Sequence, residues 1–414
     1  MMQRRLLRSR VSALFVLTLL VSVCVQSVPA KVAYADDDVI RIAVIGSITG
    51  VYAFGGNEVK NAIELAVEKR GTVLGKKIEF EAADANDASQ VISEFERLYA
   101  KGFRVFMGTY APFADFAVQG VVDEYGAILM SAAGWANELT ANKIKNYFHW
   151  SARVGVFGTR MGEYMPQYAE KYLGVKKENL RVALIWNTNV EYVAIAAREG
   201  LKAAGITPVF EEGYPADRKD FTALVANLQS NKIDVLIPCQ GSADGVPFRK
   251  KMVEMGYAPP MLFAMGLIYD QPDFGALGAD VVDGCLVLSY THPFINRDKA
   301  RGLADFTESY KAKHGWYPLT HATQTYAATL FMFDMIEKAG AYDVDKIREA
   351  IESADVPKGQ YPNYWAVKFD DYHRNLGAGD PLVIGQWQKG TLVPVGTDEI
   401  KVGEAIIPWD PSKL

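Results

Sequence analysis

The stretch IRIAVIGSITGVYAFGGNEVKNAIELAVEKR, residues 40–70, decides the expected fold. Apolar residues alternate over positions 40–44, which predicts a buried β-strand. Apolar residues then recur at helical spacing over positions 59–67, which predicts a helix. We expect Gly56 or Asn57 to cap the start of that helix. The stretch therefore predicts a strand, a loop and a helix, the unit of an α/β fold.

The loop of this unit, SITGVYAFGGN, is rich in glycine and hydroxyl groups. Backbone N–H groups at a helix N-terminus attract anions and carbonyl oxygens, and Tyr52 and Phe54 add flat apolar surface beside them. This combination suits a small organic ligand. The alternative is an ordinary loop of an α/β protein with no ligand.

The first 35 residues have the pattern of a secretory signal peptide. Four arginines precede an apolar run over residues 11–25, and Ala33 and Ala35 provide the small residues that a signal peptidase requires. The apolar run is shorter than the roughly 20 residues that span a bilayer, which argues against a permanent anchor. We expect cleavage after Ala35, which would also remove Cys24, and export to the periplasm.

The formal charge of the full chain is −5, and removal of the five positive charges in residues 1–35 leaves −10. An acidic chain offers no electrostatic footprint for nucleic acid or for an anionic membrane surface. About 380 mature residues exceed what one hydrophobic core usually supports, so we expect two lobes. The remaining cysteines, Cys239 and Cys285, lie in apolar strand-like runs, and both buried thiols and a disulfide between them remain open.

The strand, loop and helix unit recurs along the chain, interrupted by the aromatic segment YFHWSARV at residues 147–154. This alternation predicts mainly parallel sheets that are covered on both faces. Three amphipathic helices are expected at about residues 298–314, 320–339 and 343–353. Residues 364–375 and 381–395 are expected to close the chain as strands.

Signatures of catalysis are missing. Gly46 and Gly50 are spaced GxxxG rather than the GxGxxG of dinucleotide sites, and Ser242 is not central in a GxSxG elbow. None of the five histidines has another histidine or a cysteine at metal-ligand spacing, although His292 could hydrogen-bond a ligand. We therefore expect no catalytic residues, no metal site and no cofactor.

Four longer segments together carry a family resemblance: residues 42–68, 108–140, 220–256 and 306–340. In this order and spacing the chain resembles the type I periplasmic solute-binding proteins of ABC transporters, in the branch of the leucine/isoleucine/valine-binding protein. The resemblance implies an α/β fold of two doubly wound lobes with mainly parallel sheets, joined by a three-crossing hinge. Lobe 1 would comprise residues 36–154 plus about 290–372, and lobe 2 residues 155–289 plus about 373–414.

The resemblance also implies a ligand site between the lobes, which would close around a small molecule. The family's ligand loops fall on residues 47–56, 108–112 and 131–135 of lobe 1, and on residues 187–192, 240–242 and 265–269 of lobe 2. The ligand-binding residues expected from these loops are Tyr52, Phe54, Gly55, Thr109, Tyr110, Ala111, Ala133, Gly134, Trp135, Asn189, Tyr192, Gln240, Leu267 and Tyr269.

Departures from the family pattern narrow the expected ligand. Amino-acid binders of the family usually place hydroxyl residues where this chain has Ala111 and Ala133. They usually place an acidic residue where it has Leu267 and Ile268, although Glu191 or Asp270 could substitute for the acid. Aromatic residues are instead frequent in the loops, which favours an aromatic or largely apolar carboxylate or amide over an ordinary amino acid. We expect the backbone N–H groups of Gly55 and Gly56 in the first loop to provide part of the polar contact with the ligand.

The expected function is that of a periplasmic substrate-binding protein of an ABC importer. Its partners would be the small-molecule ligand and the permease subunits in the inner membrane, and the family default is a monomer. An exported ligand-sensing domain is the first alternative. A secreted two-domain α/β enzyme is the second, and the missing catalytic signatures argue against it.

Overall fold

A computed structural model describes residues 38–50 and 52–410. The expected signal peptide, with Cys24, lies outside these residues. Within them, no helix combines the length and the apolar character that crossing a membrane requires.

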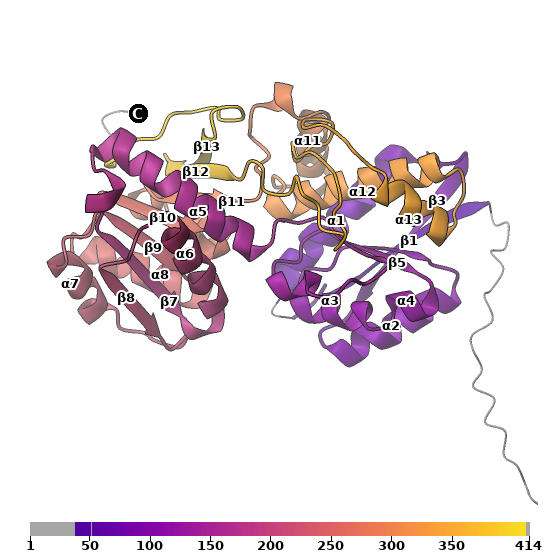
Figure 1. The fold of residues 1–414 in the computed structure, drawn as a ribbon, viewed down its shortest axis with the longest axis horizontal. Coiled ribbons are helices and arrows are strands. Elements are labelled where there is room, and N and C mark those ends of the chain that lie inside the picture. The colour runs from indigo at the N-terminus through magenta and orange to yellow at the C-terminus, as the bar shows by residue number, and fades with distance from the viewer. Residues whose placement is uncertain (1–37, 51, 411–414) are drawn as a thin grey trace, which may run out of the picture. The chain divides into compact units, whose positions relative to one another are not determined.

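The elements alternate along most of the chain as the sequence predicts (Figure 1). The strands are β1 (Val39–Gly46), β2 (Thr72–Val73), β3 (Lys76–Asp84), β4 (Val105–Met107), β5 (Ile128–Ser131), β6 (Tyr147–His149), β7 (Val182–Asn187), β8 (Phe210–Tyr214), β9 (Val235–Cys239), β10 (Met261–Met265), β11 (Leu286–Ser289), β12 (Val383–Gln388) and β13 (Thr391–Gly396). The α-helices are α1 (Ala53–Arg70), α2 (Ala88–Ala100), α3 (Pro112–Gln119), α4 (Val122–Tyr125), α5 (Val154–Tyr168), α6 (Glu191–Ala203), α7 (Thr222–Ser230), α8 (Ser242–Glu254), α9 (Pro272–Gly275), α10 (Ala279–Val282), α11 (Leu303–His314), α12 (Thr320–Ala339) and α13 (Val344–Glu352). Short 3₁₀ or π turns are η1 (Asn137–Thr140), η2 (Ala169–Leu173), η3 (Lys177–Asn179), η4 (Thr188–Val190), η5 (Leu267–Asp270) and η6 (Arg297–Lys299).

The strands form two sheets, which confirms the predicted fold class. The first has the order β2-β3-β1-β4-β5-β6 and the second the order β13-β12-β11-β10-β9-β7-β8. In the first sheet only the short β2 runs antiparallel to its neighbour. In the second, β12 and β13 form an antiparallel hairpin on an otherwise parallel sheet. The sequence limits proposed for the two lobes stay a prediction.

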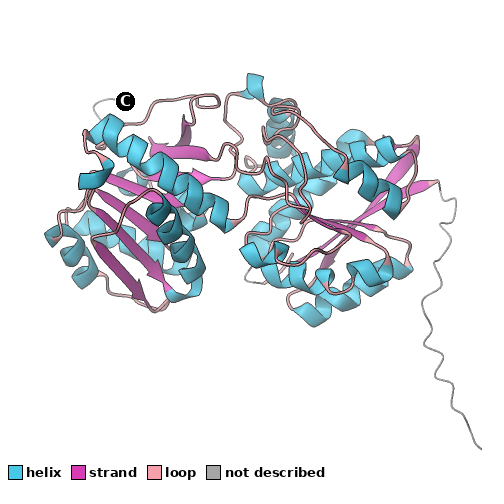
Figure 2. Cartoon of the chain, in the orientation of Figure 1, coloured by secondary structure: helices cyan, strands magenta, loops and turns pink. Residues whose placement is uncertain are grey.

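Each sheet is buried on both faces by helices (Figure 2). In β1, Ile42 and Val44 pack in the cluster that contains α1 residues, whereas Ala43 and Ile45 pack with residues of α2 and α3. In β7 the same alternation holds, because Leu184 packs in one apolar cluster and its neighbour Ile185 packs in another. Because successive strand residues point to opposite faces, a near-continuous apolar strand requires cover on both sides.

The helix after β1 begins earlier than the sequence predicts. Its first residue is Ala53, and the N–H of Gly56 already donates to the carbonyl of Tyr52 at 3.0 Å. Asn57 does not cap the helix; its amide donates to the carbonyls of Ile48 (2.9 Å) and Ala53 (2.7 Å) and so fastens the loop to the helix. The expectation that Gly56 offers a free N–H to a ligand is therefore wrong.

Residues 112–125 form two helices, α3 and α4, because the turn at Gly120 separates them. One further element prediction needs correction. Residues 364–375 are not a continuous strand and make only isolated bridges, such as Phe369 with Asn375. Both Cys239 and Cys285 are buried free thiols.

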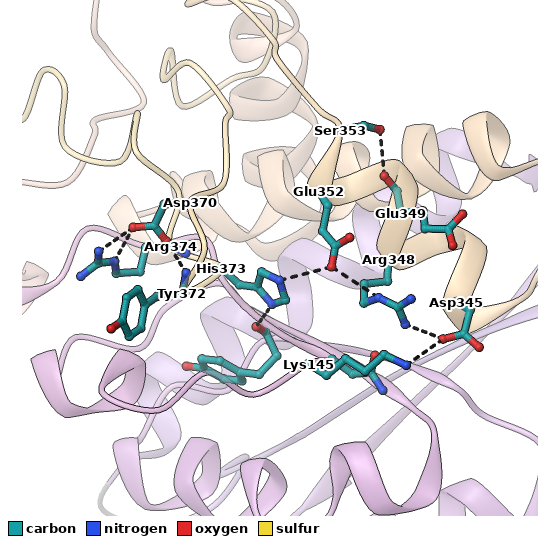
Figure 3. Close-up of polar contacts among 12 residues, drawn as sticks. Lys145, Asp345, Arg348, Glu349, Glu352, Ser353, Asp370, Tyr372, His373 and Arg374 are labelled. Carbon is teal, nitrogen blue, oxygen red and sulfur yellow. Dashed lines mark hydrogen bonds and ion pairs between the residues drawn. The ribbon is translucent and has the colours of Figure 1, made fainter.

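Side-chain contacts fix residues 370–374 against β6 and α13 (Figure 3). The His373 ring lies near the main chain of β6, with Nδ1 at 3.2 Å from the carbonyl of Tyr147. Its Nε2 lies 3.3 Å from Glu352 of α13. An Asp370–Arg374 pair at 2.6 Å closes the loop on itself. This segment is therefore fixed by local polar contacts rather than by a strand ladder.

Candidate functional site

The strand order reverses at two places, and ligand sites of open α/β sheets form outside the strand ends at such points. In the first sheet the reversal lies between β1 and β4, and in the second between β7 and β9. The loops after β1 and β4 carry Tyr52 and Tyr110, and the segment after β7 leads to Tyr192. The topology thus places these three aromatic residues at the switch points.

The loop after β1 is held by Asp84 at the end of β3. Its carboxylate accepts the backbone N–H groups of Ile48 (2.8 Å) and Thr49 (3.0 Å). The hydroxyl of Thr49 also donates to it, and these hydrogen bonds lower the pKa of Asp84. These N–H groups are engaged within the protein, so the first loop offers fewer free donors than its composition implies.

Tyr52 and Tyr110 form one wall of a candidate site. Their ring centroids are 6.5 Å apart, and Tyr52 also lies 6.2 Å from Phe113. A Cβ at Gly55 would lie 2.2 Å from the Tyr110 ring, so only glycine lets this ring lie against the first turn of α1. Tyr52 remains 46% exposed, which leaves its ring accessible.

Trp135, which follows β5, lies in the middle of a second aromatic group. Its ring centroid lies 5.2 Å from that of Phe157, 6.0 Å from that of Tyr192 and 6.3 Å from that of Tyr290. The indole Nε1 is buried and has no hydrogen-bond partner among the residues that the structure describes. A buried N–H donor without a partner is costly, so this atom suits a ligand acceptor.

Two residues of this site were missed at the sequence level, Tyr290 and His321. Tyr290 follows β11, and His321 is the second residue of α12. Their rings lie 5.5 Å apart, and His321 lies 5.0 Å from Tyr110, so they connect the two aromatic groups. Tyr290 could have been found as the residue after a predicted strand, as its neighbour His292 was. His321 carried no such signal, because it does not follow a predicted strand.

A buried polar group lies beside His321. The hydroxyl of Ser151 donates to Gln324 Oε1 at 3.3 Å, and Gln324 Nε2 lies 3.3 Å from His321 Nδ1. Donation from the amide makes Nδ1 the acceptor, so the ring proton resides on Nε2. Burial lowers the pKa of His321 to about 4, so the ring is neutral at neutral pH. His321 can therefore donate one hydrogen bond without adding charge.

A buried carboxyl group underlies the loops after β4 and β5. Asp115 is fully buried beside Thr109 and Ser131, and a Cβ at Gly134 would lie 2.7 Å from its Oδ2. Burial raises the pKa of Asp115 to about 6, against the opposing effect of nearby hydroxyl groups. Gly134 thus allows the loop to lie against this carboxyl group, and the Thr109 hydroxyl is one of the groups that oppose the rise in its pKa.

The ligand-binding residues predicted in the loops of the second sheet differ in how far their side chains are buried. Gln240 and Tyr269 are fully buried, and the Tyr269 hydroxyl donates to Gln240 Oε1 at 2.6 Å. Their polar atoms are paired with each other within the core, and the expectation that both residues bind the ligand stays a prediction. Asn189 is exposed and Leu267 half-buried, the latter at a positive φ of 59°.

The remaining predicted positions of the first sheet differ in exposure. Ala111 and Ala133 are each 2% exposed, so their side chains act as small packing residues. Phe54 is 49% exposed, on the first turn of α1. The side chains that the structure brings together are Tyr52, Tyr110, Trp135 and Tyr192, with Tyr290 and His321 added.

No group of three or more histidine, cysteine, aspartate or glutamate side chains in residues 38–50 and 52–410 is arranged to hold a metal ion. The candidate site thus consists of aromatic surface and a small number of polar atoms. Such an arrangement suits binding of an organic molecule.

Comparison with known proteins identifies related chains. The family model described as periplasmic binding protein matches residues 39–391. The Leu/Ile/Val-binding protein homolog 7 of Brucella suis is 27% identical over 397 residues, which cover 94% of this chain and 99% of the relative.

Two solved structures share the fold. A leucine binding protein from Thermotoga maritima is 21% identical, covers 91% of this chain and 100% of its own, and has a TM-score of 0.70. A solute binding protein of an ABC transporter from R. palustris, in complex with benzoate, is 18% identical with a TM-score of 0.70 and covers 90% of this chain and 99% of its own.

Proposed function

Because the chain belongs to the periplasmic binding protein family, we propose that it is the solute-binding protein of an ABC importer. It captures a small organic solute and delivers it to permease subunits in the inner membrane. Residues 1–35 direct export to the periplasm and are removed, and the mature protein acts as a monomer. No covalent step is involved.

The observation that carries this proposal is the contact between Trp135 and Tyr192. Trp135 follows β5 of the first sheet, and Tyr192 lies in the first turn of α6, which follows β7 of the second. Their ring centroids are 6.0 Å apart. A ligand between these rings would bind surfaces of both sheets at once, which is the requirement for closure of two lobes around a solute.

We infer that the ligand is an aromatic or largely apolar carboxylate or amide. The aromatic walls provide apolar contact, and the neutral N–H groups of Trp135 and His321 provide donors for a carboxylate or carbonyl oxygen. The benzoate complex of the R. palustris protein is consistent with a ligand of this class in this fold.

A branched-chain amino acid is the second candidate, favoured by the Leu/Ile/Val-binding relatives. The small residues Ala111 and Ala133 and the apolar Leu267 argue against it, because an α-ammonium and an α-carboxylate both require polar partners. Glu191 and Asp270 are acids in or beside the second-sheet loops that could meet an ammonium group.

Calorimetric titration of the purified protein with benzoate and with leucine separates the two candidates. The proposal predicts saturable binding of benzoate, recovery of the benzoate unchanged, and binding at least tenfold weaker for leucine. Preferential binding of leucine would favour the second candidate. Chemical turnover of either compound would overturn the assignment as a binding protein.

A further inference from the structure

Gln324 is a fully buried polar residue next to the candidate site. It lies on α12, three positions after His321. Residues three positions apart are neighbours on one face of a helix, so the Gln324 amide can reach the His321 ring. The His321 ring is half-buried and contacts Tyr110 and Tyr290. Gln324 therefore connects the candidate site to the interior of the protein.

The Gln324 amide is shared between two partners. Its Oε1 accepts the Ser151 hydroxyl at 3.3 Å, and its Nε2 lies 3.3 Å from His321 Nδ1. An amide has one acceptor oxygen and one donor nitrogen, so the nitrogen that faces His321 can only donate. The ring nitrogen that receives this hydrogen bond carries no proton.

Ser151 links the amide to a residue of the second sheet. Ser151 follows β6, and its hydroxyl forms a hydrogen bond with Tyr290, which follows β11. Burial raises the pKa of Tyr290 well above its usual value, and Ser151 opposes this rise only in part. The phenol therefore keeps its proton and can donate it to the Ser151 oxygen, which leaves the Ser151 proton for Gln324.

The surroundings keep the His321 ring neutral. Burial lowers its pKa to about 4. The titratable groups in contact with the ring are the phenols of Tyr110 and Tyr290. Burial raises the pKa of Tyr110 to about 12 and that of Tyr290 well above its usual value, so both phenols are also neutral. A proton on Nδ1 would point at the N–H groups of Gln324, so the amide opposes protonation together with burial.

The tautomer of His321 decides what a solute meets at Nε2. An oxygen atom of a carboxylate or an amide is bound by an N–H group and repelled by the lone pair of the other tautomer. Both tautomers are uncharged, so the hydrogen bond from Gln324 to Nδ1 selects between them.

We propose that Gln324 is a positioning residue of the solute site, which fixes the Nε2–H group of His321 as a donor to an acceptor oxygen of the solute. This role rests on the proposed function, because a solute with such an oxygen is the ligand class proposed above. Gln324 is 0% exposed, so it acts through His321 and not by touching the solute.

Nitrogen-15 NMR of the histidine side chains in the ligand-free protein at pH 7 tests the control of the ring by Gln324. The chain has five histidines, and the signals lost in His321→Phe are those of His321. We expect the wild-type proton on Nε2 and none on Nδ1. In Gln324→Glu the carboxylate can only accept, so Nδ1 should gain a proton and the pKa of His321 should rise by about 1–3. The matched control Gln229→Glu, at an exposed residue of α7, should leave the His321 signals unchanged.

Calorimetric titration with benzoate tests the contact with the solute. Gln324→Met keeps a side chain of similar length and removes both hydrogen bonds, so the affinity should fall by about three- to tenfold. The control Gln229→Met should bind as the wild type does. Addition of benzoate to the wild type should also shift the Nε2 signal of His321. Circular dichroism melting of each variant checks that the fold is intact.

Three results would overturn the proposal: a wild-type proton on Nδ1, an Nδ1 without a proton in folded Gln324→Glu, or equal benzoate affinity of the wild type and folded Gln324→Met. An Nε2 signal that saturating benzoate leaves unchanged would overturn it as well. Absence of benzoate binding to the wild type would contradict the proposed ligand class and the contact with His321. The spectra of the ligand-free protein would still decide whether Gln324 selects the tautomer, so the two failures are distinguishable.

Discussion

The indole ring of Trp135 lies edge-on to the phenol ring of Tyr192, with centroids 6.0 Å apart and an interplanar angle of 82°. The two residues are 57 positions apart in sequence and belong to elements of different sheets. Edge-to-face contacts of this kind are worth about 0.5–1.5 kcal/mol beyond the burial of area. A ligand that entered between the rings would replace this contact by one contact with Trp135 and one with Tyr192.

Replacement of Trp135 by alanine should weaken binding of the solute by about 10- to 100-fold, since central aromatic residues carry much of a binding free energy. Trp135→Phe keeps an aromatic ring but removes the Nε1 donor, and an intermediate affinity is expected. Calorimetry is the measurement, because the substitutions remove a fluorophore. Equal affinities of the wild type and Trp135→Ala would place the solute elsewhere.

Gly55 should be intolerant of a side chain only while Tyr110 is present. A Cβ at Gly55 would meet the Tyr110 ring at 2.2 Å, so Gly55→Ala should lower the free energy of unfolding by about 1–3 kcal/mol. In a Tyr110→Ala background the same change should raise it by about 1 kcal/mol, because alanine is the better helix former. Denaturant melts of the four proteins form a double-mutant cycle. The same sign in both backgrounds would contradict the packing.

The alternation of apolar strands and helices predicted both sheets and most helices, because burial on two faces leaves a clear pattern in the sequence. The predicted start of α1 was too late, because Phe54 and Gly55 have low helix propensity. The helix nevertheless begins at Ala53, so its start is determined by the surrounding structure rather than by local propensity. Residues 364–375 were misassigned because β-prone side chains there, such as Trp365, are buried without a ladder.

The candidate site was predictable only where it lies directly after strands. Tyr52, Tyr110 and Trp135 follow β1, β4 and β5. These strands are neighbours in the first sheet, so the loops after them lie along the same edge of the sheet. Tyr269 also follows a strand, but its side chain turns into the core, and strand periodicity does not determine side-chain direction in the following loop. His321 reaches the site from a helix that lies far along the chain, and no local pattern encodes that contact.

Asp115 should make stability depend on pH. Its pKa is raised from 3.8 to about 6, so the folded state favours the protonated form. This contribution is fully present below pH 3.8 and is lost as the pH rises through about 6. Asp115→Asn should therefore raise the free energy of unfolding at pH 7.5 by about 1–3 kcal/mol and have little effect at pH 3.5.

Thermal melts of Asp115→Asn and of the exposed control Asp273→Asn at both pH values are the measurement. The control should shift by no more than about 0.5 kcal/mol. A destabilised Asp115→Asn at pH 7.5 would show that the folded protein requires the ionised carboxylate.

His321 allows packing and hydrogen bonding to be separated. The ring lies 5.0 Å from Tyr110 and 5.5 Å from Tyr290, and because its pKa is lowered to about 4, substitution at pH 7 removes no charge. His321→Phe retains the ring contacts and loses the Nε2 donor, whereas His321→Ala loses both. If Nε2 binds the solute, both variants should weaken binding about tenfold or more, since an unmade hydrogen bond to a charged acceptor costs about 1.5–3 kcal/mol. If the residue only supports Tyr110 and Tyr290, His321→Phe should bind as the wild type does and His321→Ala should not. Calorimetric titration of both variants with benzoate decides between these roles, and wild-type affinity in both would remove His321 from the site.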